Sequence, residues 1–395
     1  MSTIFATLWM KTCLHIYSEQ YWSYICGNSK IYKLMSHIPS PTVNVNTQDF
    51  HKTLRKRVNA YFKSKNIDKH GNAAMKYKTV AMLAIYFVPY FFVLSGIISN
   101  WWLLVPFAIM GFGMAGIGLS VMHDANHGAY SRNRPFNDWV SRIVNLVGGY
   151  DTNWRIQHNV LHHTYTNIDG MDEDIDPGGV LRFSPHQPVK SFHRFQHYYA
   201  WFLYGLMTII WATTKDYKQL YRYEKMDLFK TQNTTFRKEF VRLTIYRVFY
   251  YFYVIGIPLL FGVSPWIVLV GFLLMHFIAG FMLGIIFQPA HVMETSEFPE
   301  PSTKDDIVRD SWAEHQLRTT TNFAPDSKFF SWYVGGLNFQ IEHHLFPNIC
   351  HIHYKKISSI VKETAQEYNL PYNVQPTFMK ALVAHGKMLK KLGQA

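Results

Sequence analysis

The sequence of 395 residues predicts an all-α integral membrane protein with four transmembrane helices in two hairpins and a cytoplasmic helical cap. Three observations support this fold class. Four apolar runs have about the 20 residues that a membrane-crossing helix needs. Charged residues make up only 16% of the chain, against about 25% in an ordinary soluble domain. The basic residues gather beside the apolar runs, as they do in multi-pass membrane proteins.

The four apolar runs cover residues 79–98, 101–121, 244–263 and 266–287. Very short uncharged segments separate the first run from the second and the third from the fourth. The runs therefore predict one helical hairpin at residues 79–121 and another at residues 244–287. Trp101 and Trp266 stand at the start of two runs, where aromatic side chains favour the membrane–water interface.

A fifth apolar stretch near residues 198–213 is too short to cross a bilayer and predicts an interfacial helix. With four spans, the polar segments 122–243 and 288–395 lie on the same side of the membrane. Lysines and arginines are abundant in residues 35–78 and 122–243 and absent from the outer turns, so the polar segments are expected in the cytoplasm. This distribution explains the net charge of +13 without a nucleic-acid partner.

The N-terminal segment divides into two parts. Residues 1–34 lack the apolar core of a signal peptide and show no clean period, so we interpret them as a doubtful extension and expect Met35 to be the natural start. Residues 35–78 form a cytoplasmic segment that contains a basic amphipathic stretch and precedes the first hairpin.

Histidines form clusters at the inner ends of the predicted spans. His123 and His127 are four residues apart, so a helix would place both rings on one face, where they can hold one metal. His158 and His162 repeat this spacing, and His163 follows directly. Because neighbouring residues on a helix point about 100° apart, adjacent histidines can serve two different metals.

A third cluster lies far along the chain. His343 and His344 follow Gln340 and Glu342, and they repeat the adjacent pair of the second cluster. His291 comes directly after the fourth apolar run, so it also lies at the inner end of a span.

Helix packing can bring these clusters together beneath the membrane. Eight imidazoles exceed one tetrahedral zinc site and suit two metals, and a set without thiolates favours iron without excluding zinc. Asp124 occupies the place of the glutamate in the zinc-protease signature HExxH, which is therefore absent. We expect Asp124, Asn126 and Glu342 to orient ligand imidazoles. The expected metal ligands are His123, His127, His158, His162, His163, His291, His343 and His344.

Other polar residues favour structural interpretations. The acidic segment at residues 172–176 is interpreted as a solvated turn, with orientation of the second cluster as the alternative. His276 lies inside the fourth apolar run and is expected to form a hydrogen bond between helices. His351 and His353 are expected at the surface or the membrane interface.

The three clusters, at residues 123–127, 158–163 and 340–344, resemble the three histidine boxes of the membrane fatty acid desaturase family. The resemblance covers the chain from about residue 52 to residue 372 and includes the four-span layout. Gln340 stands where the third box ordinarily begins with histidine. This replacement is similar to the front-end acyl desaturases, including linoleoyl-CoA or delta-6-type enzymes, which act between an existing double bond and the carboxyl end.

The resemblance implies a non-haem di-iron enzyme that uses O2 and two delivered electrons to insert a cis double bond into an acyl-CoA or acyl-lipid. It implies that the eight histidines bind iron and that no catalytic residue acts beyond the metal centre. Gln340 becomes a weak or water-mediated ligand, and Asn322 and Gln316 belong to the surroundings of the ligands.

The electron supply is expected to be a separate protein. Many front-end members carry a fused cytochrome b5 domain marked by the string His-Pro-Gly-Gly. The similar string here begins with Asp176 and lacks that haem-binding histidine. We therefore expect ferredoxin, or cytochrome b5 with its reductase, as the donor.

Two alternatives stay open. A lipid hydroxylase or ketolase on the same di-iron scaffold would share every ligand named above. A metal transporter is more remote, because it would place ionisable residues in the middle of several spans, and here His276 is the histidine well inside one.

Overall fold

The structure, a computed structural model, describes residues 45–300 and 312–394 and is predominantly helical. The expectations for residues 1–34 lie outside the described residues. Four helical segments among the described residues are long and apolar enough to cross a membrane, which is the number that the sequence predicts. They cover Ala73–Leu94, Asn100–Asn126, Phe236–Leu260 and Pro265–His291.

The first span, α5 (Ala73–Leu94), begins before the apolar run because a polar residue caps it. The side-chain oxygen of Asn72 accepts a hydrogen bond from the backbone N–H of Ala74 at 2.9 Å, which satisfies a donor at the helix start. The helix ends earlier than the sequence predicts, and Gly96 has a φ of +70° in the turn that follows. Glycine adopts this left-handed conformation without steric cost.

The second and third spans are interrupted by π-helical turns, in which the chain is wound more loosely than in an α-helix. The second span consists of η1 (Asn100–Leu103), α6 (Leu104–Gly116), the π-helical η2 (Ile117–Met122) and α7 (His123–Asn126). The third consists of α14 (Phe236–Tyr251), the π-helical η8 (Phe252–Gly256) and α15 (Ile257–Leu260). The fourth span is one helix, α16 (Pro265–His291).

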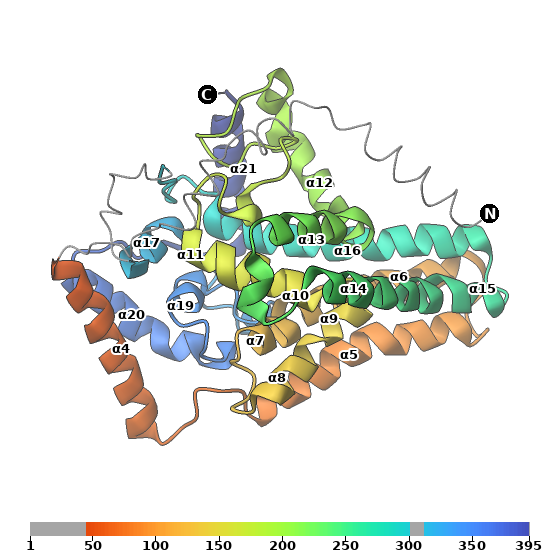
Figure 1. The fold of residues 1–395 in the computed structure, drawn as a ribbon, viewed down its shortest axis with the longest axis horizontal. Helices are drawn as coiled ribbons and strands as arrows, with labels where there is room; N and C mark the ends of the chain where they lie inside the picture. Colours follow the sequence, from red (N-terminus) through yellow and green to blue (C-terminus); the bar gives the residue numbers. More distant parts are fainter. Residues whose placement is uncertain (1–44, 301–311, 395) are drawn as a thin grey trace. The chain divides into compact units, whose positions relative to one another are not determined.

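Glycines allow the spans to pack closely. Helix α6 lies between α5 and α16 (Figure 1). A Cβ atom on Gly113 would lie 2.7 Å from the backbone nitrogen of Tyr86 on α5. A Cβ atom on Gly111 would lie 2.6 Å from the carbonyl oxygen of Met275 on α16. Both contacts are too short for a larger residue, so these glycines set the spacing of the helices.

The fifth apolar stretch forms α12 (Gln196–Ile210), which packs along α16. It continues through the π-helical η6 (Trp211–Lys215) into α13 (Asp216–Lys225). Its location at the membrane interface stays a prediction. His276 of α16 lies 2.8 Å from the hydroxyl of Tyr250 and 3.1 Å from that of Thr208, so the expected hydrogen bond between helices is confirmed.

A separate apolar core lies around α4 (Val45–Lys65), α17 (Trp312–Thr319), α19 (Gln340–Leu345) and α20 (Tyr354–Glu367). Helix α4 contributes Phe50, Leu54 and Val58 to this core, all fully buried and spaced four residues apart. This spacing produces one apolar stripe along the helix, and the stripe packs against the protein.

Short elements connect these parts and hold several of the site residues. They are α8 (Arg134–Ser141), α9 (Ile143–Leu146), α10 (Asp151–Trp154), η3 (Arg155–His162), α11 (His163–Tyr165), η4 (Glu173–Ile175), η5 (Ser191–Phe195), η7 (Leu228–Gln232), α18 (Lys328–Tyr333), η9 (His351–His353) and α21 (Phe378–Gln394). The structure departs from the all-α prediction in one short parallel pair, in which β1 (Asn322–Phe323) bonds to β2 (Val374–Gln375).

Candidate metal centre

All eight histidines predicted as ligands lie in one region, at the end of the spans where α7 and α16 finish. Their side chains come from the ends of two spans, from the two short helical segments η3 and α11, and from α19. Seven are buried and His127 is partly buried. Residues that are far apart in the sequence therefore form one compact cluster of imidazoles.

The first histidine group contains His123, His127, His158 and His343, and one ring nitrogen of each lies within 4.8 Å of the others. The Nε2 atom of His158 lies 3.3 Å from that of His123 and 3.4 Å from that of His343. Two imidazole nitrogens bound to one metal at about 2.1 Å are roughly 3.0–3.4 Å apart in octahedral or tetrahedral geometry. The observed distances are those of a ligand set.

The second histidine group contains His162, His291 and His344, whose ring nitrogens also lie within 4.8 Å of one another. The Nε2 atom of each ring is buried and has no hydrogen-bond partner among the described residues. A buried polar atom without a partner costs free energy unless something binds it. Three such nitrogens that converge on one point therefore fit a second metal.

His163 connects the two groups. Its Nε2 atom lies 3.0 Å from the Nε2 atom of His343 and 3.3 Å from that of His158, both in the first group. It also forms a group of its own with His343 and His344, and His344 belongs to the second group. The two candidate metal positions are therefore neighbours.

The second box has a geometry that the sequence does not predict. A regular helix would place His158 and His162 on one face for one metal, but the first histidine group contains His158 and the second contains His162. The two rings share a group only with the carboxylate of Asp174. The segment η3 that carries both is π-helical, and the two rings lie nearly parallel, with centroids 5.1 Å apart. The Nδ1 atoms of both rings face the carboxylate of Asp174 at 3.5 Å, so the Nε2 atoms are free to serve the two groups.

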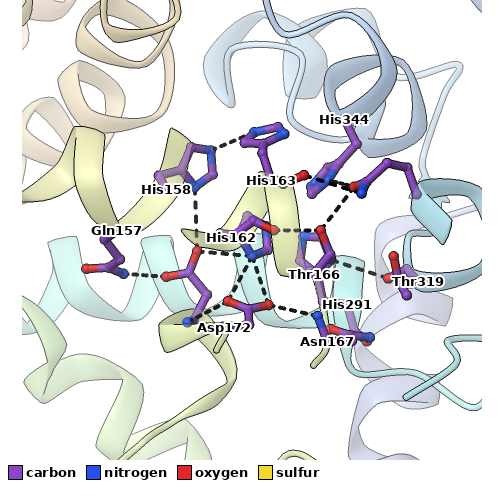
Figure 2. Close-up of polar contacts among 12 residues, drawn as sticks. Gln157, His158, His162, His163, Thr166, Asn167, Asp172, His291, Thr319 and His344 are labelled. Carbon is purple, nitrogen blue, oxygen red and sulfur yellow. Dashed lines mark hydrogen bonds and ion pairs between the residues drawn. The ribbon is translucent and has the colours of Figure 1, made fainter. Parts of the chain in front are cut away.

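Asp172 fixes the orientation of His162 (Figure 2). Its carboxylate accepts a hydrogen bond from Nδ1 of His162 at 3.0 Å and from the backbone N–H groups of Asn167 and Asp174 at 2.9 Å each. The interpretation of this segment as a solvated turn is wrong for Asp172, which is 1% exposed. The acidic run just after the second box is the sequence signal for this role of Asp172. The sequence pattern does not show that the backbone N–H groups of Asn167 and Asp174 bind its carboxylate.

Gln316 and Thr319 contact the Nδ1 atoms of two rings of the second histidine group. The side-chain oxygen of Gln316 accepts hydrogen bonds from Nδ1 of His344 at 2.7 Å and from the hydroxyl of Thr166 at 3.0 Å. The Nδ1 atom of His291 lies 3.4 Å from the carbonyl oxygen of Thr319 (Figure 2). A bond at Nδ1 fixes the tautomer and leaves Nε2 available to a metal. The sequence named Gln316 and gave no signal for Thr166 or Thr319.

Asp124 has partners other than the box histidines. Its carboxylate accepts hydrogen bonds from Nδ1 of His351 at 2.8 Å and from the thiol of Cys350 at 2.9 Å. The Nζ atom of Lys78 lies 2.6 Å from Nε2 of the same His351 ring. His351 and His353 are each 5% exposed, so their expected place at the surface is wrong. Cys350 and His351, which follow the third box, lie inside the protein, where they donate hydrogen bonds to the buried carboxylate of Asp124.

The remaining residues expected around the ligands support the third box. The side-chain nitrogen of Asn322 donates to Glu342 at 2.8 Å, and its oxygen accepts from the backbone N–H of Ile341 at 2.9 Å. Tyr372 donates to the other carboxylate oxygen of Glu342 at 2.7 Å. These bonds hold the start of α19, which carries His343 and His344.

Two amides in the region have a different character. Gln340 is fully buried, and neither atom of its amide has a hydrogen-bond partner among the described residues. The side-chain nitrogen of Asn126 contacts the sulfur of Met122 at 3.4 Å. The free polar atoms of Gln340 match the expectation of a weak or water-mediated contact, which stays a prediction.

Electrostatics keep most of the rings neutral. Burial, followed by repulsion from neighbouring imidazoles, lowers the pKa well below its usual value for five of the box histidines: His127, His158, His163, His343 and His344. Burial also opposes the charged form of His162, but the carboxylates of Asp172 and Asp174 outweigh it and raise its pKa to about 9. Neutral imidazole is the form that binds metal.

A family model for fatty acid desaturases matches residues 99–376. The chain belongs to the fatty acid desaturase family. Two sn-1 linoleoyl-lipid 6-desaturases are each 36% identical to it. The one from Arthrospira platensis aligns over 347 residues, which is 87% of this chain and 92% of the relative. The one from Synechocystis sp. aligns over 350 residues, which is 88% of this chain and 96% of the relative.

A further relative in the desaturase family is the acyl-lipid (8-3)-desaturase of Physcomitrium patens. It is 37% identical over 354 residues, which cover 88% of this chain and 72% of the relative. Membership of this family supports an oxidoreductase that acts on fatty acyl chains and favours that enzyme over a metal transporter.

Proposed function

We propose that this desaturase uses O2 and two electrons at a histidine-ligated di-iron centre to introduce a cis double bond into an acyl-lipid. The observation that carries the proposal is the pair of adjacent histidine groups with buried, convergent ring nitrogens. Eight imidazoles are too many for one metal and suit two. The lack of thiolates among them favours iron.

The two histidine groups assign the ligands. His123, His127, His158 and His343 would hold one iron, and His162, His291 and His344 would hold the other, with His163 between them. Iron with O2 supplies the oxidising power to take hydrogen from an unactivated methylene, which no side-chain base can do.

The protein supplies orientation and a dry environment. Asp172 and Gln316 bind the Nδ1 atoms of His162 and His344 and thereby hold the rings toward the metals. Trp154 and Phe287 pack against the first histidine group, with ring centroids 4.4 Å and 5.9 Å from that of His158. Such apolar rings keep water away from the place where an acyl chain reacts.

The class of substrate follows from the relatives and from the third box. Relatives aligned over most of this chain are named as desaturases of acyl-lipids, so we propose a lipid-bound substrate rather than acyl-CoA. Gln340 at the start of the third box supports front-end selectivity. The basic segments beside the spans support a cytoplasmic location of the histidine end.

Expression in a host fed linoleate tests the proposal. Gas chromatography and mass spectrometry of derivatised lipids should reveal a product with two hydrogens fewer and a new double bond on the carboxyl side. The purified protein should contain two irons. His162→Ala should abolish product and lower the iron content, while His186→Ala, a histidine outside both groups whose Nε2 lies 2.8 Å from the carbonyl oxygen of Phe298, should change neither.

The same experiment separates the alternatives. A lipid product that has gained oxygen would replace the desaturase with a hydroxylase or ketolase. Purified protein without bound transition metal would contradict the di-iron proposal.

A further inference from the structure

The exposed face of α4 is strongly basic. Lys52, Arg55, Lys56 and Lys63 are all exposed. Their spacing of three, four and seven residues places them on one side of the helix. None of these four cations has an ion-pair partner among the residues that the structure describes. We call them the α4 basic face.

The opposite side of α4 is already occupied. Phe50, Leu54 and Val58 are fully buried in the core that α4 shares with α17, α19 and α20. Arg57, at the edge, forms two hydrogen bonds of 2.7 Å with Glu367 of α20. The helix therefore cannot turn an apolar face into a bilayer, as a membrane-surface helix does. Its exposed side carries these four cations and one exposed acid, Asp49, which leaves an excess of positive charge.

A chain of contacts connects α4 to the metal centre. The ring of His51, on α4, meets the ring of Trp312 edge to face with centroids 5.6 Å apart. The indole N–H of Trp312 donates a hydrogen bond of 3.0 Å to the carbonyl oxygen of His163. His163 is the histidine that connects the two groups. Two side chains thus bridge the space between a surface helix and the centre, and in Figure 1 α4 and α17 lie near each other at the same end of the spans.

We propose that the α4 basic face docks a small acidic one-electron carrier protein, and that electrons enter through His51 and Trp312 to His163. This inference rests on the proposed function, because it names the partner of that same di-iron site. Electron-transfer complexes are small and transient, with interfaces below about 1,200 Å². A single helix face suits such a partner, and opposite charge steers it to the surface.

The electron count requires such a partner. Each desaturation breaks two carbon–hydrogen bonds and forms one carbon–carbon double bond, which releases two hydrogens with two electrons. Reduction of O2 to two waters consumes four electrons and four protons. The remaining two electrons come from two carrier molecules, each oxidised by one electron, and the remaining two protons come from water.

A second lysine-rich surface provides the matched control. Lys387, Lys390 and Lys391 of α21 line a surface pocket of about 460 Å³ together with Glu294. Each of the two surfaces includes one acid, Glu294 here and Asp49 on α4, so the two are comparable in charge. The connection from α21 inward leads through His385 to the carbonyl oxygen of Val292, at 2.7 Å.

Binding measurements test the docking surface directly. One variant combines Lys52→Glu, Arg55→Glu and Lys56→Glu, and the control combines Lys387→Glu, Lys390→Glu and Lys391→Glu, an equal change of charge. Each protein is placed in nanodiscs of neutral phosphatidylcholine. Affinity is measured for two acidic probes, a plant-type ferredoxin and the haem domain of cytochrome b5. We expect the α4 variant to lose roughly tenfold or more in affinity at low salt for the probe that binds, and the control to lose much less.

Reduction kinetics test the route. Trp312→Leu should leave carrier affinity unchanged and slow the reduction of iron by the carrier, followed by stopped-flow absorbance. Reduction of the same variant by dithionite, followed by one turnover with O2, should yield as much product as the wild type does. If the dithionite-reduced variant gave less product than the wild type in that turnover, the substitution would have disturbed His163 itself. This result would overturn the proposal that electrons pass through Trp312.

The outcomes separate this inference from the proposed function. Absence of product from the dithionite-reduced wild type would refute the di-iron desaturase. Two results would refute the docking surface alone, provided that the single turnover gives normal product. One is equal carrier affinity of the two charge-reversed variants, and the other is no binding of either probe. If the charge reversal on α4 lowered carrier affinity in nanodiscs of anionic lipid but not in neutral ones, the α4 basic face would bind lipid headgroups instead of the carrier. That result would also refute the docking surface.

Discussion

Replacement of Asp172 by asparagine should weaken one of the two metal positions and spare the other. The carboxylate accepts bonds from His162 and from the backbone N–H groups of Asn167 and Asp174. Asparagine keeps one acceptor oxygen and places an N–H2 group against a donor. Loss of a hydrogen bond to a charged group costs about 1.5–3 kcal/mol. At about 1.4 kcal/mol per factor of ten, this cost predicts metal binding weaker by roughly 10–100-fold at the second histidine group.

Iron content measured against a graded chelator checks this prediction. The wild type should lose its two irons together over a narrow range, while Asp172→Asn should lose one iron at a chelator concentration about 10–100-fold lower. Asp176→Asn is the control, because Asp176 lies in the same segment, is exposed, and accepts a bond from Gly178 at 3.0 Å. Equal retention of both irons by a folded Asp172→Asn protein would refute the orienting role of this carboxylate.

Three further predictions concern the pH, a buried ion pair and a glycine. Without metal, the pKa of His162 is about 9, so below pH 9 a proton competes with the metal; affinity at the second histidine group should fall about tenfold per unit as the pH drops from 9 to 7, measured by chelator competition. Arg247→Met leaves the carboxylate of Asp216 buried without its ion pair and should destabilise the protein by about 3–5 kcal/mol in thermal unfolding, with partial recovery on adding Asp216→Asn. Gly335→Ala should lower the melting temperature more than Gly262→Ala, because both have positive φ but only the first Cβ would meet a neighbour, 2.3 Å away. An equal drop in melting temperature for Gly335→Ala and Gly262→Ala would contradict the packing argument. Either full recovery of stability or no recovery in the variant that combines Arg247→Met with Asp216→Asn would contradict the argument about the buried charge.

Composition and periodicity predicted the spans because bilayer thickness limits what can cross. The apolar runs gave the number of candidate spans, but their ends depended on local partners such as the cap formed by Asn72. The apolar stripe of α4 was visible as amphipathic, yet nothing in the pattern told whether Phe50 and Leu54 would face lipid or protein. That choice is made by α20, which is distant in the sequence.

The candidate site was predictable in its ligand types and less so in its surroundings. Histidine spacing indicated which rings would gather, because adjacent and fourth-neighbour positions restrict where rings can point. The partners that hold those rings come from remote segments, as Gln316 does for His344. The acidic run around Asp172 favours a solvated turn, whereas the backbone partners that bury Asp172 exist only after the chain has folded back.

The loosely wound turns η2 and η3 have a consequence for the directions in which the ligand rings point. η2 directly precedes His123, and η3 itself carries His158 and His162. A π-helical turn holds about one residue more than an α-helical turn. If all the residues of η2 were kept and wound as a regular α-helix, everything after them would rotate by about 100°. His123 and His127 would then face away from their partners although every histidine was still present. The directions of the ligand rings therefore depend on the π-helical backbone, and the same histidine sequences on a regular α-helix would not form the site.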